Sequence, residues 1–143
     1  MNAFLWLLRA AVAATFGWAA VTKIADPGGF FAAILTYRSL PEAGALLLAL
    51  WLPWAELTAA GAVFWPRHRR AALGLLFAFA LMFLGALSQA WLRGLDINCG
   101  CFGRPALVRG PAYLHYLARD LVLLGTIAWL LWRDRRVAPA NSG

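Results

Sequence analysis

Charged residues are scarce in this chain, and their scarcity excludes a soluble globular domain. Asp, Glu, Lys and Arg make up 13% of the 143 residues, whereas 63% are apolar and eight are Trp. A soluble domain of this length has too little interior to keep that much apolar surface away from water. The sequence also lacks internal repeats and any sign of a second domain, so we predict one domain over residues 1–136.

Long apolar runs take up most of the chain, and four of them predict membrane-spanning helices over about residues 3–25, 43–65, 71–92 and 112–132. A helix needs about 20 apolar residues to cross the ~30 Å hydrocarbon core. In lipid, its backbone N–H and C=O groups form hydrogen bonds within the helix itself. We therefore predict an all-α fold, an integral membrane four-helix bundle with a Gly- and Cys-rich loop between the third and fourth helices. The first run contains Arg9 and follows no basic residue, so we expect a retained span and not a cleaved signal peptide. We expect residues 137–143 to form a disordered tail.

Basic residues predict the orientation of this bundle. With four spans, the N-terminus, the link between the second and third spans and the C-terminal tail share one side of the membrane. Six Arg residues lie close to helix ends on that side, and five Lys and Arg residues lie on the other. The first set is Arg67, Arg69, Arg70, Arg133, Arg135 and Arg136, and the second is Lys23, Arg38, Arg93, Arg104 and Arg109. The positive-inside rule then predicts a bacterial inner-membrane protein with both termini inside and the cysteine loop outside. Because the basic residues gather at membrane edges, they indicate contact with the bilayer and no nucleic-acid partner.

Cysteine is nearly absent, because Cys99 and Cys101 are the only two and a single Gly100 separates them. Two thiols this close at a membrane surface can exchange a disulfide with a partner or bind a soft metal ion. They can also be two small residues in a tight turn, with a structural role alone. Asp96 and His115 are further metal-ligand types nearby, but nothing fixes their spacing, so we assign no metal site. The two cysteines are the candidate catalytic residues.

Charged residues inside the spans are a second candidate group. Arg9 lies about 9 Å from the inner end of the first span, and Glu56 about 14 Å from the inner end of the second, at about 1.5 Å per residue. We predict that Arg9 and Glu56 form a buried ion pair, since pairing is the least costly arrangement for charge in a membrane. Such a pair has either a structural role or a place in a proton pathway.

Four other charged residues lie near the predicted cysteine loop and are candidates for tuning its thiols. Arg119 and Asp120 lie about 10 Å below the outer surface on the fourth span, where Arg119 is placed to stabilise a thiolate and Asp120 has a tuning or a structural role. Because adjacent residues point in different directions on a helix, we expect no pair between these two. Asp96 is a candidate proton relay or loop cap. Lys23 either tunes the site or extends its ammonium to the interface.

A short apolar stretch follows the first span. Asp26 and Pro27 predict a new helix there, with Asp at the N-cap and Pro at the first helical position. The stretch is too short to span, and its aromatic residues Phe30, Phe31 and Tyr37 are spaced for one face. We expect this helix to lie along the outer membrane interface.

Motifs in order along nearly the whole chain resemble the MauE family, the membrane proteins of methylamine utilisation within the wider DoxX-like group. The most specific of them is the run Cys99-Gly100-Cys101-Phe102-Gly103 in a four-span context. The others are Phe16-Gly17, Lys23 with Asp26-Pro27, Phe31, Tyr37 with Leu40-Pro41, Leu52-Pro53-Trp54-Ala55-Glu56-Leu57, Arg93-Gly94, Asp96-Ile97-Asn98 and Arg119-Asp120. The resemblance implies a helper in maturing the disulfide-rich small subunit of methylamine dehydrogenase, with a thioredoxin-like partner called MauD.

The sequence thus predicts a membrane thiol–disulfide oxidoreductase that passes redox equivalents to or from a thioredoxin-like partner. Two alternatives remain, a carrier of soft metal ions and a non-catalytic scaffold for a redox enzyme. By analogy, membrane thiol oxidoreductases of the DsbB and vitamin K epoxide reductase types also have four helices, but they carry extra cysteines and a quinone. This chain has one cysteine pair and no visible quinone motif, so the sequence does not support a quinone cofactor.

Overall fold

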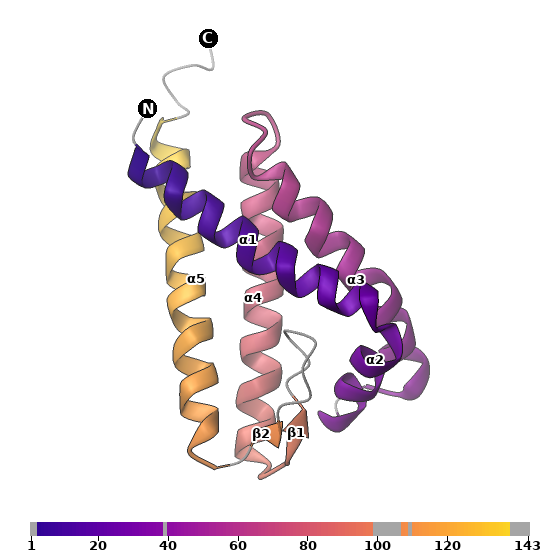
Figure 1. Ribbon diagram of the computed structural model, residues 1–143. Helices are drawn as coiled ribbons and strands as arrows, with labels where there is room; N and C mark the ends of the chain where they lie inside the picture. Colours follow the sequence, from indigo (N-terminus) through magenta and orange to yellow (C-terminus); the bar gives the residue numbers. More distant parts are fainter. Residues whose placement is uncertain (1–2, 39, 99–106, 109, 138–143) are drawn as a thin grey trace.

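The computed structural model describes residues 3–38, 40–98, 107–108 and 110–137, and five helices make up most of this part of the chain (Figure 1). A two-stranded antiparallel hairpin connects the last two helices. In chain order the elements are α1 (Ala3–Ala25), α2 (Pro27–Thr36), α3 (Glu42–Ala62), α4 (Arg69–Leu92), β1 (Ile97–Asn98), β2 (Leu107–Val108) and α5 (Ala112–Val137).

Four of the helices, α1, α3, α4 and α5, are long and apolar enough to cross a membrane. They fall on the four apolar runs of the sequence, which confirms the predicted all-α bundle of four membrane helices. The boundaries differ by a few residues. The largest difference is at α5, which continues to Val137, beyond the predicted end of the fourth span at residue 132, while α3 ends at Ala62 and not at residue 65. The last turns of α5 therefore carry charged residues that the sequence placed outside the helix. The rest of the predicted tail, residues 138–143, lies outside the described residues.

The spanning helices form two packed antiparallel pairs, α1 with α3 and α4 with α5 (Figure 1). The first pair crosses the second obliquely, so α1 passes over both α4 and α5 along its length. The start of α1, the end of α5 and the α3–α4 connection lie at one end of the bundle. Helix α2 and the β1–β2 hairpin lie at the opposite end, where α2 contacts β1.

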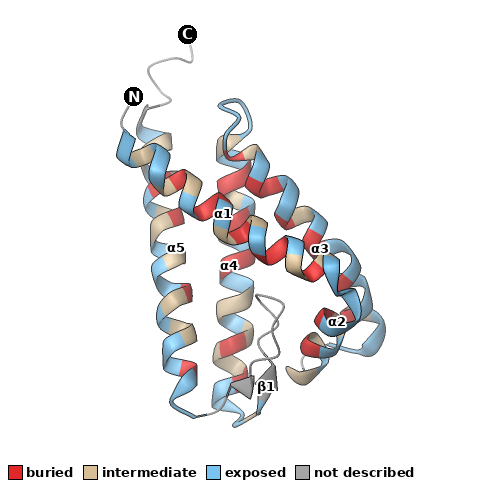
Figure 2. Ribbon diagram, in the orientation of Figure 1, coloured by how far each residue is buried: buried red, intermediate tan, exposed pale blue. Residues whose placement is uncertain are grey.

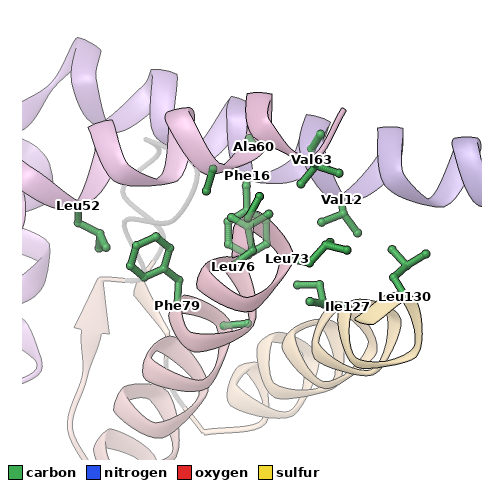
Figure 3. Close-up of a cluster of buried hydrophobic side chains, with 14 of the residues drawn as sticks. Val12, Phe16, Leu52, Ala60, Val63, Leu73, Leu76, Phe79, Ile127 and Leu130 are labelled. Atoms are coloured by element: carbon green, nitrogen blue, oxygen red, sulfur yellow. The ribbon is translucent and has the colours of Figure 1, made fainter. Parts of the chain in front are cut away.

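The apolar core lies where the two helix pairs cross. All four spanning helices contribute to it, as Figure 3 shows for Val12, Phe16, Leu52, Ala60, Val63, Leu73, Leu76, Phe79, Ile127 and Leu130. The outward faces are also apolar, and Figure 2 shows exposed residues along the outside of every helix. Leu47 and Val122 are each 70% exposed and Leu92 is 84% exposed. Surfaces of this kind are stable against lipid tails, which solvate Leu as well as a protein interior does.

Helix α2 begins as the sequence predicts. The Asp26 carboxylate accepts a hydrogen bond of 3.0 Å from the backbone N–H of Gly29, and Pro27 is the first helical residue. A Cβ atom at Gly29 would press on that carboxylate, so a larger residue there would require the Asp26 side chain to shift. Phe30 and Ala33 are buried, and the helix packs against α3. That α2 follows the membrane interface stays a prediction.

Packing at the crossing should carry much of the stability of the fold. Leu76 is fully buried in the core, so replacing it by Ala leaves a cavity that its neighbours fill only partly. We expect Leu76→Ala to lower the free energy of unfolding by about 2–5 kcal/mol in detergent. Leu47→Ala makes the same chemical change on the exposed face of α3 and should have little effect. Thermal unfolding of both variants checks this, and equal losses would contradict a core at the crossing.

Candidate functional site

The β1–β2 hairpin fixes the two ends of the cysteine-bearing segment. Ile97 pairs with Val108 and Asn98 with Leu107 in antiparallel register. Residues 99–106 connect the paired positions, and the predicted redox residues Cys99 and Cys101 therefore lie outside the described residues. The structure describes the residues that flank this segment, and these lie at the end of the bundle opposite the start of α1 and the end of α5 (Figure 1).

Gly94 turns the chain from α4 into the hairpin. Its φ of +66° is in the left-handed region that favours glycine. The Gly94 N–H donates to the Trp91 carbonyl and the Leu95 N–H to the Ala90 carbonyl, each over 3.0 Å. This is the Schellman arrangement, which satisfies the last carbonyls of a helix and gives the chain a defined exit direction.

Side chains from α4 and α5 anchor the surroundings of the hairpin. The buried Tyr113 hydroxyl donates to the Leu95 carbonyl over 2.5 Å, which fixes the approach to β1 against α5. Gln89 Nε2 donates to the Tyr37 carbonyl over 3.3 Å, and Arg93 Nη1 to the same oxygen over 3.4 Å. The end of α2 is thus attached to the end of α4, and the approach to the hairpin is attached to α5.

Asp96 and His115 lie close to these anchoring residues. Asp96 is exposed and immediately precedes β1, as a loop-capping or proton-relay residue would require. The exposed His115 ring makes an edge contact with Tyr116, with centroids 5.6 Å apart. Within the described part of the chain, which excludes both cysteines, no three His, Asp or Glu side chains gather as metal ligands.

Lys23 and Glu56 form a buried ion pair between α1 and α3. The Lys23 ammonium donates to both carboxylate oxygens, over 2.9 and 3.1 Å, and the two residues are 2% and 0% exposed. The same ammonium lies 5.0 Å from the centre of the Phe30 ring and 4.6 Å from that of Phe83. The expectation that Lys23 extends to the interface is wrong, because the Glu56 carboxylate holds its ammonium inside the bundle.

The predicted pair between Arg9 and Glu56 is also wrong. Arg9 Nη2 instead donates to Asp134 Oδ1 on α5 over 2.7 Å. Glu56 is bonded to Lys23, which lies 14 residues beyond Arg9 on α1. At about 1.5 Å per residue, Arg9 is therefore about 21 Å along α1 from the level of Glu56.

Arg119 and Asp120 pair with each other, contrary to the expectation for adjacent helical residues. Arg119 Nε and Nη2 both donate to Asp120 Oδ1, over 3.0 and 2.8 Å. A guanidinium group on a long side chain can fold back to its neighbour and bind it with two donors, which the direction of the Cα–Cβ bonds alone does not reveal. Arg119 also lies over the Tyr116 ring, 5.2 Å from its centre.

Two of these ion pairs line one cavity. The cavity has a volume of about 280 Å³ and lies among α1, α3, α4 and α5. Lys23 and Glu56 line it together with Arg119 and Asp120, and apolar side chains such as Phe16 and Phe83 supply most of the remaining wall. Ionisable groups inside membrane proteins commonly line such cavities and mark functional sites.

Sequence reasoning missed three residues that the structure brings to these sites. Asp134 had a signal, since it is the one acid among three basic residues at the end of α5. Tyr113 and Phe83 had none, because an aromatic residue in an apolar run does not reveal whether it bonds a loop or faces a cation.

These features define a class, a multi-pass membrane protein of four helices with a cysteine-bearing segment at one end and paired charges within. The sequence matches the family described as methylamine utilisation protein MauE over residues 1–133, and the chain belongs to this family.

The chain is 37% identical to the methylamine utilization protein MauE of Paracoccus denitrificans over 121 residues, which cover 83% of this chain and 63% of that protein. It is also 37% identical to the corresponding protein of Paracoccus versutus over 98 residues, or 68% of this chain and 53% of that one. The chain therefore aligns with between half and two thirds of these relatives. No solved structure matches it significantly.

The ion-pair assignment leads to a double-mutant test. Lys23→Met or Glu56→Met alone leaves one buried charge without its partner, so each should destabilise the protein in detergent. The double variant leaves neither charge, and we expect it to recover part of the loss, with a coupling of about 0.6–1.7 kcal/mol as for polar pairs in membranes. The matched cycle of Arg9→Met with Glu56→Met should be additive. Coupling in the second cycle and none in the first would contradict the observed pairing.

Proposed function

We propose that this protein is a membrane thiol–disulfide exchange protein, with Cys99 and Cys101 as the redox pair and a thioredoxin-like domain as partner. The pairing of Ile97-Asn98 with Leu107-Val108 is the observation that supports it most. This pairing brings the two ends of the cysteine segment together at one end of the bundle, which is where we propose that the partner docks. Such an arrangement favours docking of a soluble domain over transport through the bundle.

The exchange is a balanced two-electron transfer. A thiolate of the partner attacks one sulfur of the Cys99–Cys101 disulfide, which forms a mixed disulfide and releases the other cysteine as a thiolate. The second thiolate of the partner then attacks its own mixed sulfur, so the partner leaves as a disulfide and Cys99 and Cys101 remain as a dithiol. Two electrons and two protons pass to this protein, and the reverse sequence passes them to the partner. A bond between cysteines one residue apart closes a small ring, which favours ready exchange.

Asp96 and Arg119 are the proposed tuning residues. Asp96 is exposed three positions before Cys99, where it can exchange protons with water as thiols gain and lose them. Arg119 lies two helical turns along α5 from the Tyr113 anchor and carries a positive charge on the hairpin side of the cavity. A cation near a thiol favours the thiolate, which is the reacting form.

The physiological setting follows from the relatives. Because both Paracoccus proteins are named for methylamine utilisation, we propose that the target of this exchange is a disulfide-containing extracytoplasmic protein of that process. We further propose that the bundle lies in the inner membrane with both termini inside, since Arg residues gather at the terminal end of the bundle.

Trapping a partner tests the exchange. A protein with one cysteine cannot resolve a mixed disulfide internally, so either Cys99→Ser or Cys101→Ser should accumulate an adduct with a thioredoxin-like partner. Non-reducing gels should show a band at the summed mass that dithiothreitol removes, and the Cys99→Ser/Cys101→Ser double variant should lack it. Full exchange activity in both single variants would rule out the mechanism, and metal affinity without exchange would favour the soft-metal carrier.

Labelling of intact cells tests the orientation. After gentle reduction, a membrane-impermeant maleimide should modify Cys99 and Cys101 without disruption of the inner membrane, because the hairpin lies at the end opposite the Arg clusters. A single cysteine placed at Arg67→Cys in the double Ser variant is the control and should react only after disruption. The opposite pattern would reverse the orientation.

A further inference from the structure

The cavity between the two ion pairs is open at one side, between α1 and α5. Ala11 and Thr15 of α1 and Val122 and Thr126 of α5 line it there, and Ala11 and Val122 are exposed. Both threonine hydroxyls donate within their own helices, Thr15 to the Ala11 carbonyl over 2.8 Å and Thr126 to the Val122 carbonyl over 2.9 Å. The opening therefore presents a mainly apolar rim, and in a bilayer it faces lipid.

The charges at the inner wall of this cavity cancel. Lys23 is paired with Glu56 and Arg119 with Asp120, so the four side chains carry no net charge. A cationic or anionic ligand would add an uncompensated charge in hydrocarbon, which is strongly unfavourable. The cavity thus selects against ions and favours neutral molecules.

The Lys23 ammonium supplies a donor at this wall. It has three N–H groups, and the pair with Glu56 uses two of them. Since Lys23 lines the cavity, the third N–H is placed to donate to a ligand. A neutral ligand that makes this bond presents an acceptor oxygen, such as a carbonyl group.

The size of the cavity limits the part of the ligand that it holds. At about 280 Å³ it exceeds a cavity of about 150 Å³ that encloses benzene and lies at the lower limit of small-molecule sites. A substituted six-membered ring fits within it, and an attached chain would leave through the opening into lipid.

We propose that this cavity binds a neutral, lipid-soluble molecule with carbonyl oxygens on an apolar body, which enters from the bilayer between α1 and α5. A carbonyl oxygen accepts a hydrogen bond from Lys23, and the apolar part of the molecule contacts Phe16 and Phe83. Both a ring dione and an acyl ester have this chemistry. The site requires neither cysteine.

Binding is tested in the Cys99→Ser/Cys101→Ser double variant, so that failure of the exchange mechanism cannot affect the result. Decylubiquinone supplies a neutral ring dione and monoolein a neutral ester, while oleate, dodecylamine and dodecane supply an anion, a cation and a pure hydrocarbon. We expect at least one carbonyl probe to bind saturably, measured by equilibrium dialysis in detergent and by a concentration-dependent rise in unfolding temperature. The probe that binds identifies which of the two carbonyl classes fits.

Two matched variants locate the site. Ala11→Trp fills the opening of the cavity, and we expect it to weaken binding at least tenfold. Ala14→Trp places the same side chain one turn along the exposed face of α1, away from the cavity lining, and should bind as the parent does. The proposal is overturned if neither carbonyl probe binds saturably, if oleate, dodecylamine or dodecane binds equally well, or if both Trp variants lose binding to the same extent.

Discussion

Hydrocarbon does not solvate charge, and this constraint governs how the helices of the protein meet. Six charged side chains within the helices combine into three ion pairs, and two of these pairs join different helices. Lys23 and Glu56 hold α1 against α3, while Arg9 and Asp134 hold α1 against α5. Apolar side chains fill the crossing between these contacts, but they would pack nearly as well in several registers. The ion pairs select one of them, since any slip would separate buried opposite charges.

The helices could be predicted from the sequence because their cause is local. A run of about 20 apolar residues has one stable form in lipid, so length and composition indicate the four spans. The start of α2 was equally local, because Asp26 and Pro27 supply the cap and the first helical residue by themselves. The end of α5 was missed because the span was ended where the apolar run stops, at residue 132. The charged residues that follow, among them Asp134 with its bond to Arg9, lie within the helix.

The pairing of charges could not be predicted, because it depends on how α1 crosses the other helices. Depths counted along separate helices assume that all four stand parallel, but α1 runs obliquely to α4 and α5 (Figure 1). Lys23, and not Arg9, is therefore the residue of α1 that reaches Glu56. The length of the Lys and Arg side chains is the second reason why the pairs were not predicted. Lys23 and Arg119 each bind an acid that the position of their backbone alone does not favour. The sequence did indicate the cysteine segment, and the structure adds the hairpin that frames it and the cavity beneath α1.

The two ion pairs of α1 differ greatly in how far apart their partners lie along the chain. Glu56 follows Lys23 by 33 residues, whereas Asp134 follows Arg9 by 125. During synthesis, α1 and α3 can therefore join as soon as the second span enters the bilayer, while Arg9 has no acid beside it until α5 arrives. Insertion of the last helix then closes the bundle and neutralises a charge that entered the membrane with the first. The N-terminal half of α1 is accordingly the part of the nascent protein that most needs a polar route or a chaperone at the insertion machinery.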